Sequence, residues 1–229
     1  MTIISVCIML PLLPFRILRI RICNYLGGFA GFVLLRLFGC PITISGRERL
    51  KTKSPVILIS NHTSTLDLFL AAWLAPVGTV GMAKKEIVYF PFIGQIYYLS
   101  GHFRVDRSNH EQSIIDLQKT REIMLRHNLS LFTWPEGTRS KCGQLLPFKK
   151  GIVHLAVQTR FPVVPFVVHG SYKSWGKNTL TMRRKPIHVE VLPMIDTSEW
   201  EISTLEKHLK ELHDLFLANL PNEQHPRRP

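Results

Sequence analysis

The chain has few cysteines, and no two of them stand close together. Its 229 residues contain four, Cys7, Cys23, Cys40 and Cys142. Their separations do not match the spacing of metal ligands, so we predict no zinc or other metal site. Without a close cysteine pair, the simple inference is a reducing, cytoplasm-facing environment.

Acidic residues are also scarce relative to basic ones. The chain has 16 Asp and Glu against 29 Lys and Arg, which gives a formal net charge of +13. Such a balance suggests a polyanionic partner, either a nucleic acid or an anionic membrane surface. Aromatic residues are not interleaved with lysines as base stacking requires, so we expect no nucleic acid partner and favour the membrane.

The N-terminal region lacks an uninterrupted apolar run of the about 20 residues that a straight bilayer span needs. It has two shorter apolar runs, at residues 3–10 and 25–35. Four arginines also occur in this region: Arg16, Arg19, Arg21 and Arg36. We expect residues 1–40 to form interfacial helices that anchor the chain, with guanidinium groups at anionic headgroups. A signal peptide is the competing interpretation, but no basic region precedes the first run.

After this anchor, short apolar segments alternate with helical patterns. With 45% hydrophobic residues the chain can build a core. The pattern predicts an α/β fold, layered, with a largely parallel sheet flanked by helices. We expect one folded domain at residues 41–220 and a frayed tail at residues 221–229. Strands are expected at 56–59, 79–83, 103–105, 129–132, 163–168 and 188–192, and helices at 65–74, 91–99, 109–126, 151–159 and 205–220.

A histidine and an aspartate follow the predicted strand at residues 56–59. Residues 61–67 read Asn-His-Thr-Ser-Thr-Leu-Asp, so His62 emerges where the strand ends. Histidine takes a proton from a hydroxyl near neutral pH when a carboxylate holds its ring in the productive tautomer. Five residues of regular helix turn through about 140°, which points two side chains apart. His62 and Asp67 can therefore meet only if His62 precedes a helix and Asp67 lies in its first turn.

The same heptad also fits a structural role. Ser64 and Asp67 have the spacing of a capping box, in which Ser64 caps a helix and Asp67 folds back to the N–H of the cap. Catalysis and capping both stay open, because one carboxylate can serve the helix and the histidine together.

A glycine-containing turn follows the predicted strand at residues 129–132. It reads Trp-Pro-Glu-Gly-Thr-Arg over residues 134–139. Gly137 lets backbone N–H groups approach a ligand, the Thr138 hydroxyl can donate, and Arg139 offers a planar fork that matches phosphate oxygens. Glu136 would repel a phosphate unless it bonds a hydroxyl or holds Arg139. The alternative is an ordinary turn with a solvated arginine.

Two more basic residues follow predicted strands. Lys84 comes after residues 79–83, and Arg107 comes after residues 103–105. Ligands of such sheets bind beyond the carboxyl ends of the strands. We therefore expect one edge of the sheet to collect a base and several cations, a layout that suits chemistry on a phosphorylated alcohol.

Four segments occur in the order and spacing of the four motifs of the glycerolipid acyltransferases. They are Asn61-His62 with Asp67, residues 101–107, residues 135–139 and residues 161–165. Over about residues 50–195 the chain resembles the PlsC type of this family, the bacterial 1-acyl-glycerol-3-phosphate acyltransferases. Four ordered motifs are far more specific than any one of them.

The resemblance implies an O-acyltransferase of phospholipid biosynthesis. Such an enzyme moves an acyl group from an acyl thioester, acyl-CoA or acyl-carrier protein, to the free hydroxyl of lysophosphatidic acid and gives phosphatidic acid. The thioester is a co-substrate, and no cofactor is expected. The implied location is the cytoplasmic face of the bacterial inner membrane.

The resemblance also implies roles for individual residues. His62 would be the general base, with Asp67 as the partner that orients it. Residues 162–165 would shape a wall near the acyl donor. The residues implied in acceptor binding are Lys84, Arg107, Glu136, Gly137, Thr138 and Arg139.

Arg104 departs from the family pattern, which usually has an aromatic or aliphatic residue at that position. On a strand it should point away from Phe103 and Val105. It either adds a phosphate contact or signals a different headgroup. Acyl transfer to another lyso-lipid, such as a lyso-ornithine lipid or a lysophospholipid, is therefore the alternative function. A non-catalytic basic membrane-binding protein is the alternative from a different class.

Overall fold

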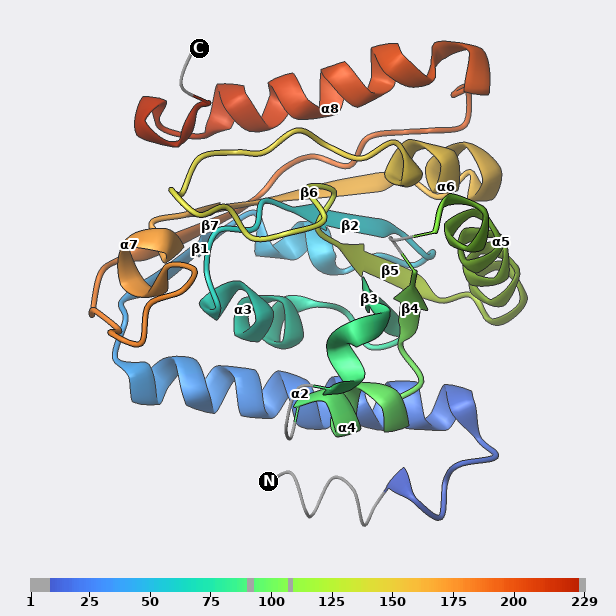
Figure 1. Cartoon of the computed structure of the whole chain (residues 1–229), viewed down its shortest axis with the longest axis horizontal. Helices are drawn as coiled ribbons and strands as arrows, with labels where there is room; N and C mark the ends of the chain where they lie inside the picture. The colour runs from blue at the N-terminus through green and yellow to red at the C-terminus, as the bar shows by residue number, and fades with distance from the viewer. Residues whose placement is uncertain (1–8, 90–92, 107–108, 227–229) are drawn as a thin grey trace.

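A seven-stranded sheet lies between two layers of helices (Figure 1). The computed structural model describes residues 9–89, 93–106 and 109–226. The strand order is β1-β7-β6-β2-β5-β3-β4, and neighbouring strands are parallel except for β6 and β7. The predicted layered α/β fold with a largely parallel sheet is confirmed.

Each predicted strand and helix has a counterpart whose ends agree within two residues. The edge strand β1 and the short helix α7 were not predicted. The strands are β1 (Ile42–Ser45), β2 (Ile57–Ser60), β3 (Thr79–Lys84), β4 (Phe103–Val105), β5 (Ser130–Thr133), β6 (Val163–His169) and β7 (Ile187–Val191). The helices are α2 (Arg16–Phe38), α3 (Leu66–Leu74), α4 (Ile93–Leu99), α5 (His110–His127), α6 (Gly151–Thr159), α7 (Ser171–Trp175) and α8 (Leu205–Asn219).

The central strand β2 is buried on both faces. Its Ile57 and Ile59 side chains join a core cluster that includes residues of α6 and α8. The alternate residues Val56 and Leu58 join a second cluster with residues of α2 and α3. Because successive side chains of a strand point to opposite faces, this uniformly apolar run fits a parallel strand with helices on both sides. The loop that leaves β2 therefore starts from a rigid position.

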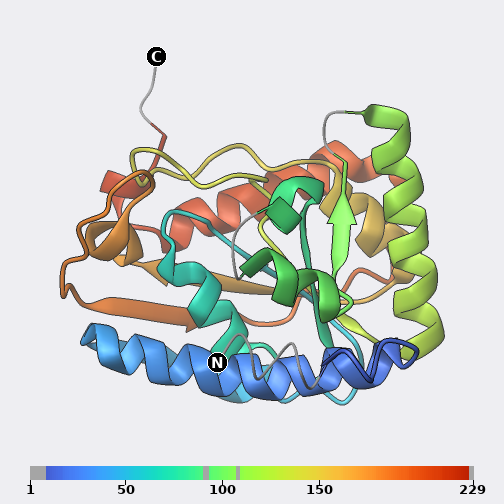
Figure 2. The same cartoon turned by 60° about the horizontal axis from the view of Figure 1, so that its bottom comes forward.

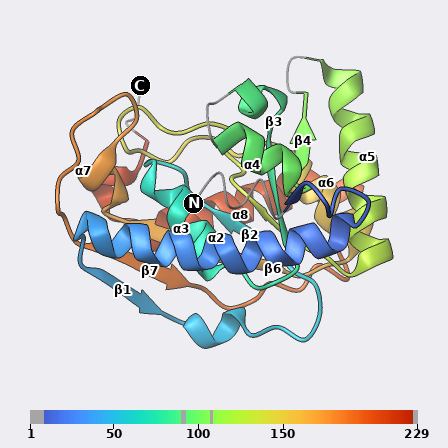
Figure 3. The same cartoon turned by 90° about the horizontal axis from the view of Figure 1, so that it is seen from below.

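Helix α2 extends along the underside of the molecule (Figures 2 and 3). It has 23 residues, and its length and composition would allow it to cross a membrane, with 17% of its most apolar window buried. One of the helices expected at residues 1–40 is present as α2, and residues 3–8 of the first apolar run lie outside the described residues.

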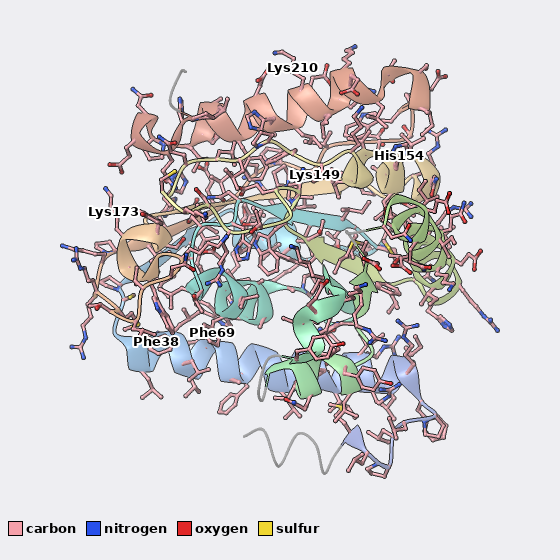
Figure 4. The ribbon with its side chains drawn as sticks, viewed as in Figure 1. Phe38, Phe69, Lys149, His154, Lys173 and Lys210 are labelled. Carbon is pink, nitrogen blue, oxygen red and sulfur yellow. The ribbon has the colours of Figure 1, made fainter. Side chains whose placement is uncertain are left out.

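The buried side of α2 packs closely on α3. A Cβ atom at Gly31 would lie 2.6 Å from the carbonyl oxygen of Phe69, so only glycine permits this approach. Near the C-terminal end of α2, the ring of Phe38 meets the ring of Phe69 edge to face, with centroids 5.7 Å apart (Figure 4). Helix α2 is therefore part of the folded domain as well as an apolar surface.

Two of the four N-terminal arginines bond within the protein. Arg16 donates from Nε and Nη2 to the carbonyl oxygen of Gly101, at 3.0 and 2.8 Å. Arg19 is buried and donates to the last carbonyl group of α4. The prediction that the arginines lie at lipid headgroups is therefore wrong for these two, whereas Arg21 and Arg36 are exposed.

The chain end also differs from expectation. Residues Asn222–Gln224 form a 3-10 turn, and Gln224 is buried. The carbonyl oxygen of Gln224 accepts the N–H of Leu145 at 2.7 Å, and its side-chain Nε2 donates to the Gly143 carbonyl at 3.3 Å. The prediction of a frayed tail is wrong for this turn, because a polar side chain bonds the long loop that precedes α6.

Candidate active site

The loop after β2 is fastened to the neighbouring strand β6 by one side chain. Asn61 is buried, its Nδ2 donates to the Val168 carbonyl at 2.9 Å, and its Oδ1 accepts the Val168 N–H at 2.8 Å. The amide thus pairs with β6 as a strand residue would. His62 follows at the carboxyl end of the central strand, where ligands of parallel sheets bind.

His62 and Asp67 are in contact. The Nδ1 atom of His62 lies 3.0 Å from Oδ2 of Asp67, which is in the first turn of α3 and 2% exposed. The His62 side chain is 12% exposed. With Nδ1 engaged by a carboxylate, Nε2 is the nitrogen left to exchange a proton with a ligand. The predicted contact is present, and the catalytic role of the pair stays a prediction.

Asp67 also caps α3. Its Oδ2 accepts the N–H groups of Thr63 and Ser64, each at 2.8 Å, and the Ser64 hydroxyl accepts the N–H of Leu66 at 3.0 Å. A carboxylate in this position is stabilised by the N-terminal end of the helix. The capping and histidine-orienting geometries are therefore both present, and they share one oxygen.

Glu136 bonds the backbone of the histidine loop. Its Oε1 accepts the N–H of His62 at 2.5 Å, and its Oε2 accepts the N–H of Leu146 at 3.0 Å. Burial raises the pKa of Glu136 to about 8, with a further rise from Asp67, while the two N–H bonds lower it. Because both oxygens are engaged and the residue is 2% exposed, the geometry contradicts the prediction that Glu136 holds the acceptor. It joins the two motif loops instead.

Trp134 stacks on the ring of His62. The ring centroids of His62 and Trp134 are 4.3 Å apart and their planes differ by 19°. The ring of Trp134 also contacts the ring of Phe132 edge to face, with ring centroids 5.1 Å apart. Sequence reasoning missed this contact because Trp134 was considered only as part of the turn. Its position directly after β5, the neighbour of β2, was the available signal.

Arg139 also contacts the histidine loop. Its Nη1 donates to the hydroxyl of Thr65 at 2.6 Å, and the following residue, Ser140, donates its N–H to the His62 carbonyl at 2.8 Å. Gly137 has a φ of 74°, which favours glycine, and lets the turn bring Thr138 and Arg139 to this edge. The structure thus brings Thr138 and Arg139 to the side of the sheet that holds His62.

A lysine that sequence reasoning missed joins them. The ammonium group of Lys177, just beyond α7, donates to the Thr138 hydroxyl at 3.1 Å and to the Arg139 carbonyl at 3.0 Å. Burial lowers the pKa of Lys177, and the charges of Arg139, Lys141 and Lys84 lower it further. Lys84, at the end of β3, therefore lies within electrostatic range of this group. Arg107 lies outside the described residues.

Two other expectations concern residues farther from His62. The backbone N–H of Ile57 bonds the Pro162 carbonyl, and Pro165 pairs with Ile59, so residues 162–165 run along the buried part of the sheet. The wall near the acyl donor that the resemblance implies for them stays a prediction. Arg104 points away from the buried Phe103, as predicted, and its guanidinium lies 4.8 Å from the centroid of the Tyr98 ring.

Known proteins resemble this chain over most of its length. A model of the family described as Acyltransferase matches residues 41–169. The 1-acyl-sn-glycerol-3-phosphate acyltransferase of Limnanthes douglasii is 45% identical over 219 residues, 96% of this chain and 77% of that protein. The protein with the same description from Salmonella typhimurium is 30% identical, over 83% of this chain and 78% of that protein.

A solved structure supports the fold. The crystal structure of the 1-acyl-sn-glycerophosphate (LPA) acyltransferase PlsC from Thermotoga maritima covers 86% of this chain, with a TM-score of 0.72 and 21% identity; the match spans 78% of that chain. The family match, the plant and bacterial relatives and this fold agree with one another. The chain belongs to the acyltransferase family, among the 1-acyl-sn-glycerol-3-phosphate acyltransferases.

Proposed function

We propose that this protein transfers an acyl group from an acyl thioester to the hydroxyl group of lysophosphatidic acid and so makes phosphatidic acid. The observation that carries the proposal is the bond between His62 and Asp67 at the carboxyl end of β2, beside the cations Arg139 and Lys177. Relatives described as 1-acyl-sn-glycerol-3-phosphate acyltransferases support the reaction and the acceptor.

The reaction needs one proton shuttle. His62 Nε2 takes the proton of the acceptor hydroxyl while that oxygen forms a bond to the thioester carbonyl carbon. The carbon–sulfur bond then breaks, and the leaving thiolate receives the proton from the His62 ring. Asp67 holds the ring in one tautomer and stabilises its protonated form, as the acidic member of a catalytic triad does. General-base catalysis of this kind contributes about 10² to 10⁴ in rate.

No covalent intermediate on the enzyme is needed, because the thioester is already activated. Positioning of the two substrates therefore supplies much of the remaining acceleration. Arg139 fits the role of a phosphate ligand, since its Nη1 uses one N–H on Thr65 and a guanidinium carries five. A phosphate fixed there determines where the acceptor hydroxyl lies relative to His62.

The membrane contact in this proposal is the outer side of α2. Leu18, Tyr25, Phe29 and Leu37 are exposed there, each by 46% or more. Apolar side chains of a helix that lies in the headgroup region enter the acyl boundary, and basic side chains favour anionic lipids. The cytoplasmic face of a bacterial inner membrane stays a prediction, and plant as well as bacterial relatives match the chain.

A panel of lyso-lipids tests the function. Radiolabelled acyl-CoA and acyl-carrier protein are offered with lysophosphatidic acid, lysophosphatidylcholine or a lyso-ornithine lipid as acceptor. We expect labelled phosphatidic acid from lysophosphatidic acid and little product from the other two. Preferred transfer to either of the others would give the protein a different acceptor.

A substitution tests the base. His62→Ala should lose transfer by at least about 10²-fold while its circular dichroism and vesicle binding stay unchanged. The matched control is His154→Ala on α6 (Figure 4), which removes a half-buried imidazole elsewhere and should keep wild-type turnover. Near-normal turnover of His62→Ala would contradict the assignment of His62 as the general base.

A further inference from the structure

We propose that Lys177 is a binding residue for the phosphate monoester of the acceptor, and that it forms one anion site together with Thr138 and Arg139. This inference rests on the proposed function and deepens it, because it adds a residue from a segment that none of the four sequence motifs includes. The segment follows β6 and α7, far along the chain from His62.

The backbone before Lys177 is fastened to the histidine loop. The carbonyl oxygen of Trp175 accepts the Ser64 hydroxyl at 2.7 Å and the N–H of Thr65 at 3.3 Å. Gly176 forms an isolated antiparallel bridge with Ser64. The hydroxyl bond and the bridge, to which the Thr65 bond belongs, fix the path of the chain immediately before Lys177, so the lysine has a set position relative to His62 and Asp67.

The ammonium group of Lys177 is only partly used. It donates to the Thr138 hydroxyl at 3.1 Å and to the Arg139 carbonyl at 3.0 Å. An ammonium has three N–H donors, so these two bonds orient the group and leave one donor for a ligand. The bond to the hydroxyl of Thr138 also leaves the hydrogen of that hydroxyl available to donate.

Among the described residues, the cations around this point form no ion pair with an acidic side chain. The ion pairs of the described residues involve none of Lys84, Arg139, Lys141 and Lys177. Their mutual repulsion is one cause of the lowered pKa of Lys177. The carboxyl groups of Asp67 and Glu136 are buried and bonded to His62 or its loop. A set of cations held together without a counter-ion is suited to a dianion, and a phosphate monoester has about that charge at neutral pH.

Two phosphates of the reaction have this chemistry, the phosphate of the lyso-lipid and the 3′-phosphate of coenzyme A. We assign the acceptor, because Lys177 bonds Thr138 and Arg139 and the fork of Arg139 is tied to Thr65, three residues from His62. A phosphate held by these groups lies near the nitrogen that removes the hydroxyl proton.

Steady-state kinetics of the full-length protein test the assignment. Lys177→Met keeps the apolar stem and removes the charge. It should raise the KM for lysophosphatidic acid about 10-fold to 100-fold, as expected for loss of a hydrogen bond to a charged group, with kcat at saturating acceptor nearly unchanged. Lys177→Arg should restore most of the affinity. The control is Lys173→Met, because Lys173 lies on the outer side of α7 and pairs with Glu223 (Figure 4).

Kinetics with two different donors distinguish binding of the lyso-lipid phosphate from binding of the coenzyme A 3′-phosphate. Two results support the assignment to the acceptor. Lys177→Met should leave the KM for acyl-CoA unchanged, and it should raise the KM for lysophosphatidic acid equally with acyl-CoA and with acyl-dephospho-CoA as donor. If Lys177→Met instead raises the KM for acyl-CoA but not the KM for acyl-dephospho-CoA, the lysine binds the donor phosphate and the assignment is overturned. If wild-type protein transfers to lysophosphatidic acid and Lys177→Met behaves like Lys173→Met, this inference fails while the proposed function stands. If wild-type protein does not acylate lysophosphatidic acid, the function itself fails.

Discussion

The Oδ2 atom of Asp67 lies 3.0 Å from the ring Nδ1 of His62 and also accepts two backbone N–H groups of the same loop. One carboxylate oxygen thus sets the ring of the histidine and the path of the chain that carries it. Because the same atom caps α3 and orients His62, the two roles of Asp67 can be separated only by measuring both stability and turnover.

Asp67→Asn separates those roles. An amide oxygen cannot hold three N–H donors as well as a carboxylate, so we expect a stability loss of about 1–3 kcal/mol. Turnover should fall by about 10²-fold or more, with the KM for the acceptor nearly unchanged, because the ring loses its orienting charge. Urea unfolding and initial rates check the two effects. Lost stability with normal turnover would leave Asp67 as a helix cap only.

Glu136→Gln probes the buried carboxyl. At low pH the variant should be the less stable protein, by about 1–3 kcal/mol, because an amide NH₂ would face one of the two backbone N–H groups. The folded pKa of about 8 lies above the ordinary value of 4.5, so between these pH values the unfolded chain gives up a proton that the folded protein keeps. The stability of wild type relative to the variant should therefore fall as pH rises from about 4.5 to 8, by at most about 1.4 kcal/mol per unit.

Denaturant unfolding in detergent at several pH values measures that difference. The variant does not titrate at this position, so subtracting its curve removes the contributions of all other groups. A difference that stays constant over this range would mean that Glu136 is already ionised in the folded protein.

Trp134→Ala should lower turnover about 10-fold to 10²-fold, because the His62 ring loses the surface against which it stacks and small misplacements of a catalytic group are costly. Trp134→Phe should retain most activity. The matched control is Trp200→Ala, since Trp200 stacks on His208 at the same 4.3 Å in another part of the fold. Both Ala variants should lose stability, but only the Trp134 variant should lose turnover at a temperature where each is folded.

Arg139→Lys keeps the charge but loses the planar fork. We expect the KM for lysophosphatidic acid to rise about 10-fold with kcat little changed, as for lost ground-state binding. Thr65→Val is the companion variant, because it removes the hydroxyl that the Arg139 fork contacts and leaves the guanidinium in place. A fall in kcat at saturating acceptor with unchanged KM would show that Arg139 acts on the transition state.

Replacing Leu18, Tyr25, Phe29 and Leu37 of α2 with serine should weaken binding to anionic vesicles by at least about 10²-fold, since each buried apolar side chain contributes about 1.5–3 kcal/mol. Deletion of residues 1–40 would be a poorer test, because Ile20 and Leu35 belong to the core. Vesicle flotation compares the variant with Ile114→Ser and Ile115→Ser on α5, which remove exposed apolar side chains elsewhere. Equal losses in both would place the membrane contact outside α2.

Local patterns predicted most of the elements. The strand at residues 103–105 and the helix at residues 151–159 have the predicted bounds, because clear polar or glycine positions flank their apolar residues. β1 was missed because its exposed positions alternate with half-buried ones, so no apolar run marks it. The antiparallel pairing of β6 and β7 depends on how the chain returns past α7, and no local signal states that direction.

Site residues that lie within a sequence motif were predicted, whereas those brought in by contacts between distant parts of the chain were missed. His62 and Asp67 are close in sequence, so their meeting follows from one strand end and one helix turn. Lys177 is one lysine in a basic stretch, and its contact with Thr138 exists only because β6 lies beside β2. The predicted role of Glu136 failed for a related reason, since burial of a carboxylate cannot be read from the turn that contains it.

The close packing of α2 on α3 has a consequence for how a lipid reaches the site. Asp67 is in the first turn of α3, and α3 rests on α2 through Gly31. If α2 lies in the plane of the headgroups, His62 and Asp67 stand at a fixed height above that plane, set by an interhelix distance of about 8–10 Å. A lyso-lipid would then need to rise by roughly that distance to be acylated, while much of its hydrocarbon tail remains in the bilayer.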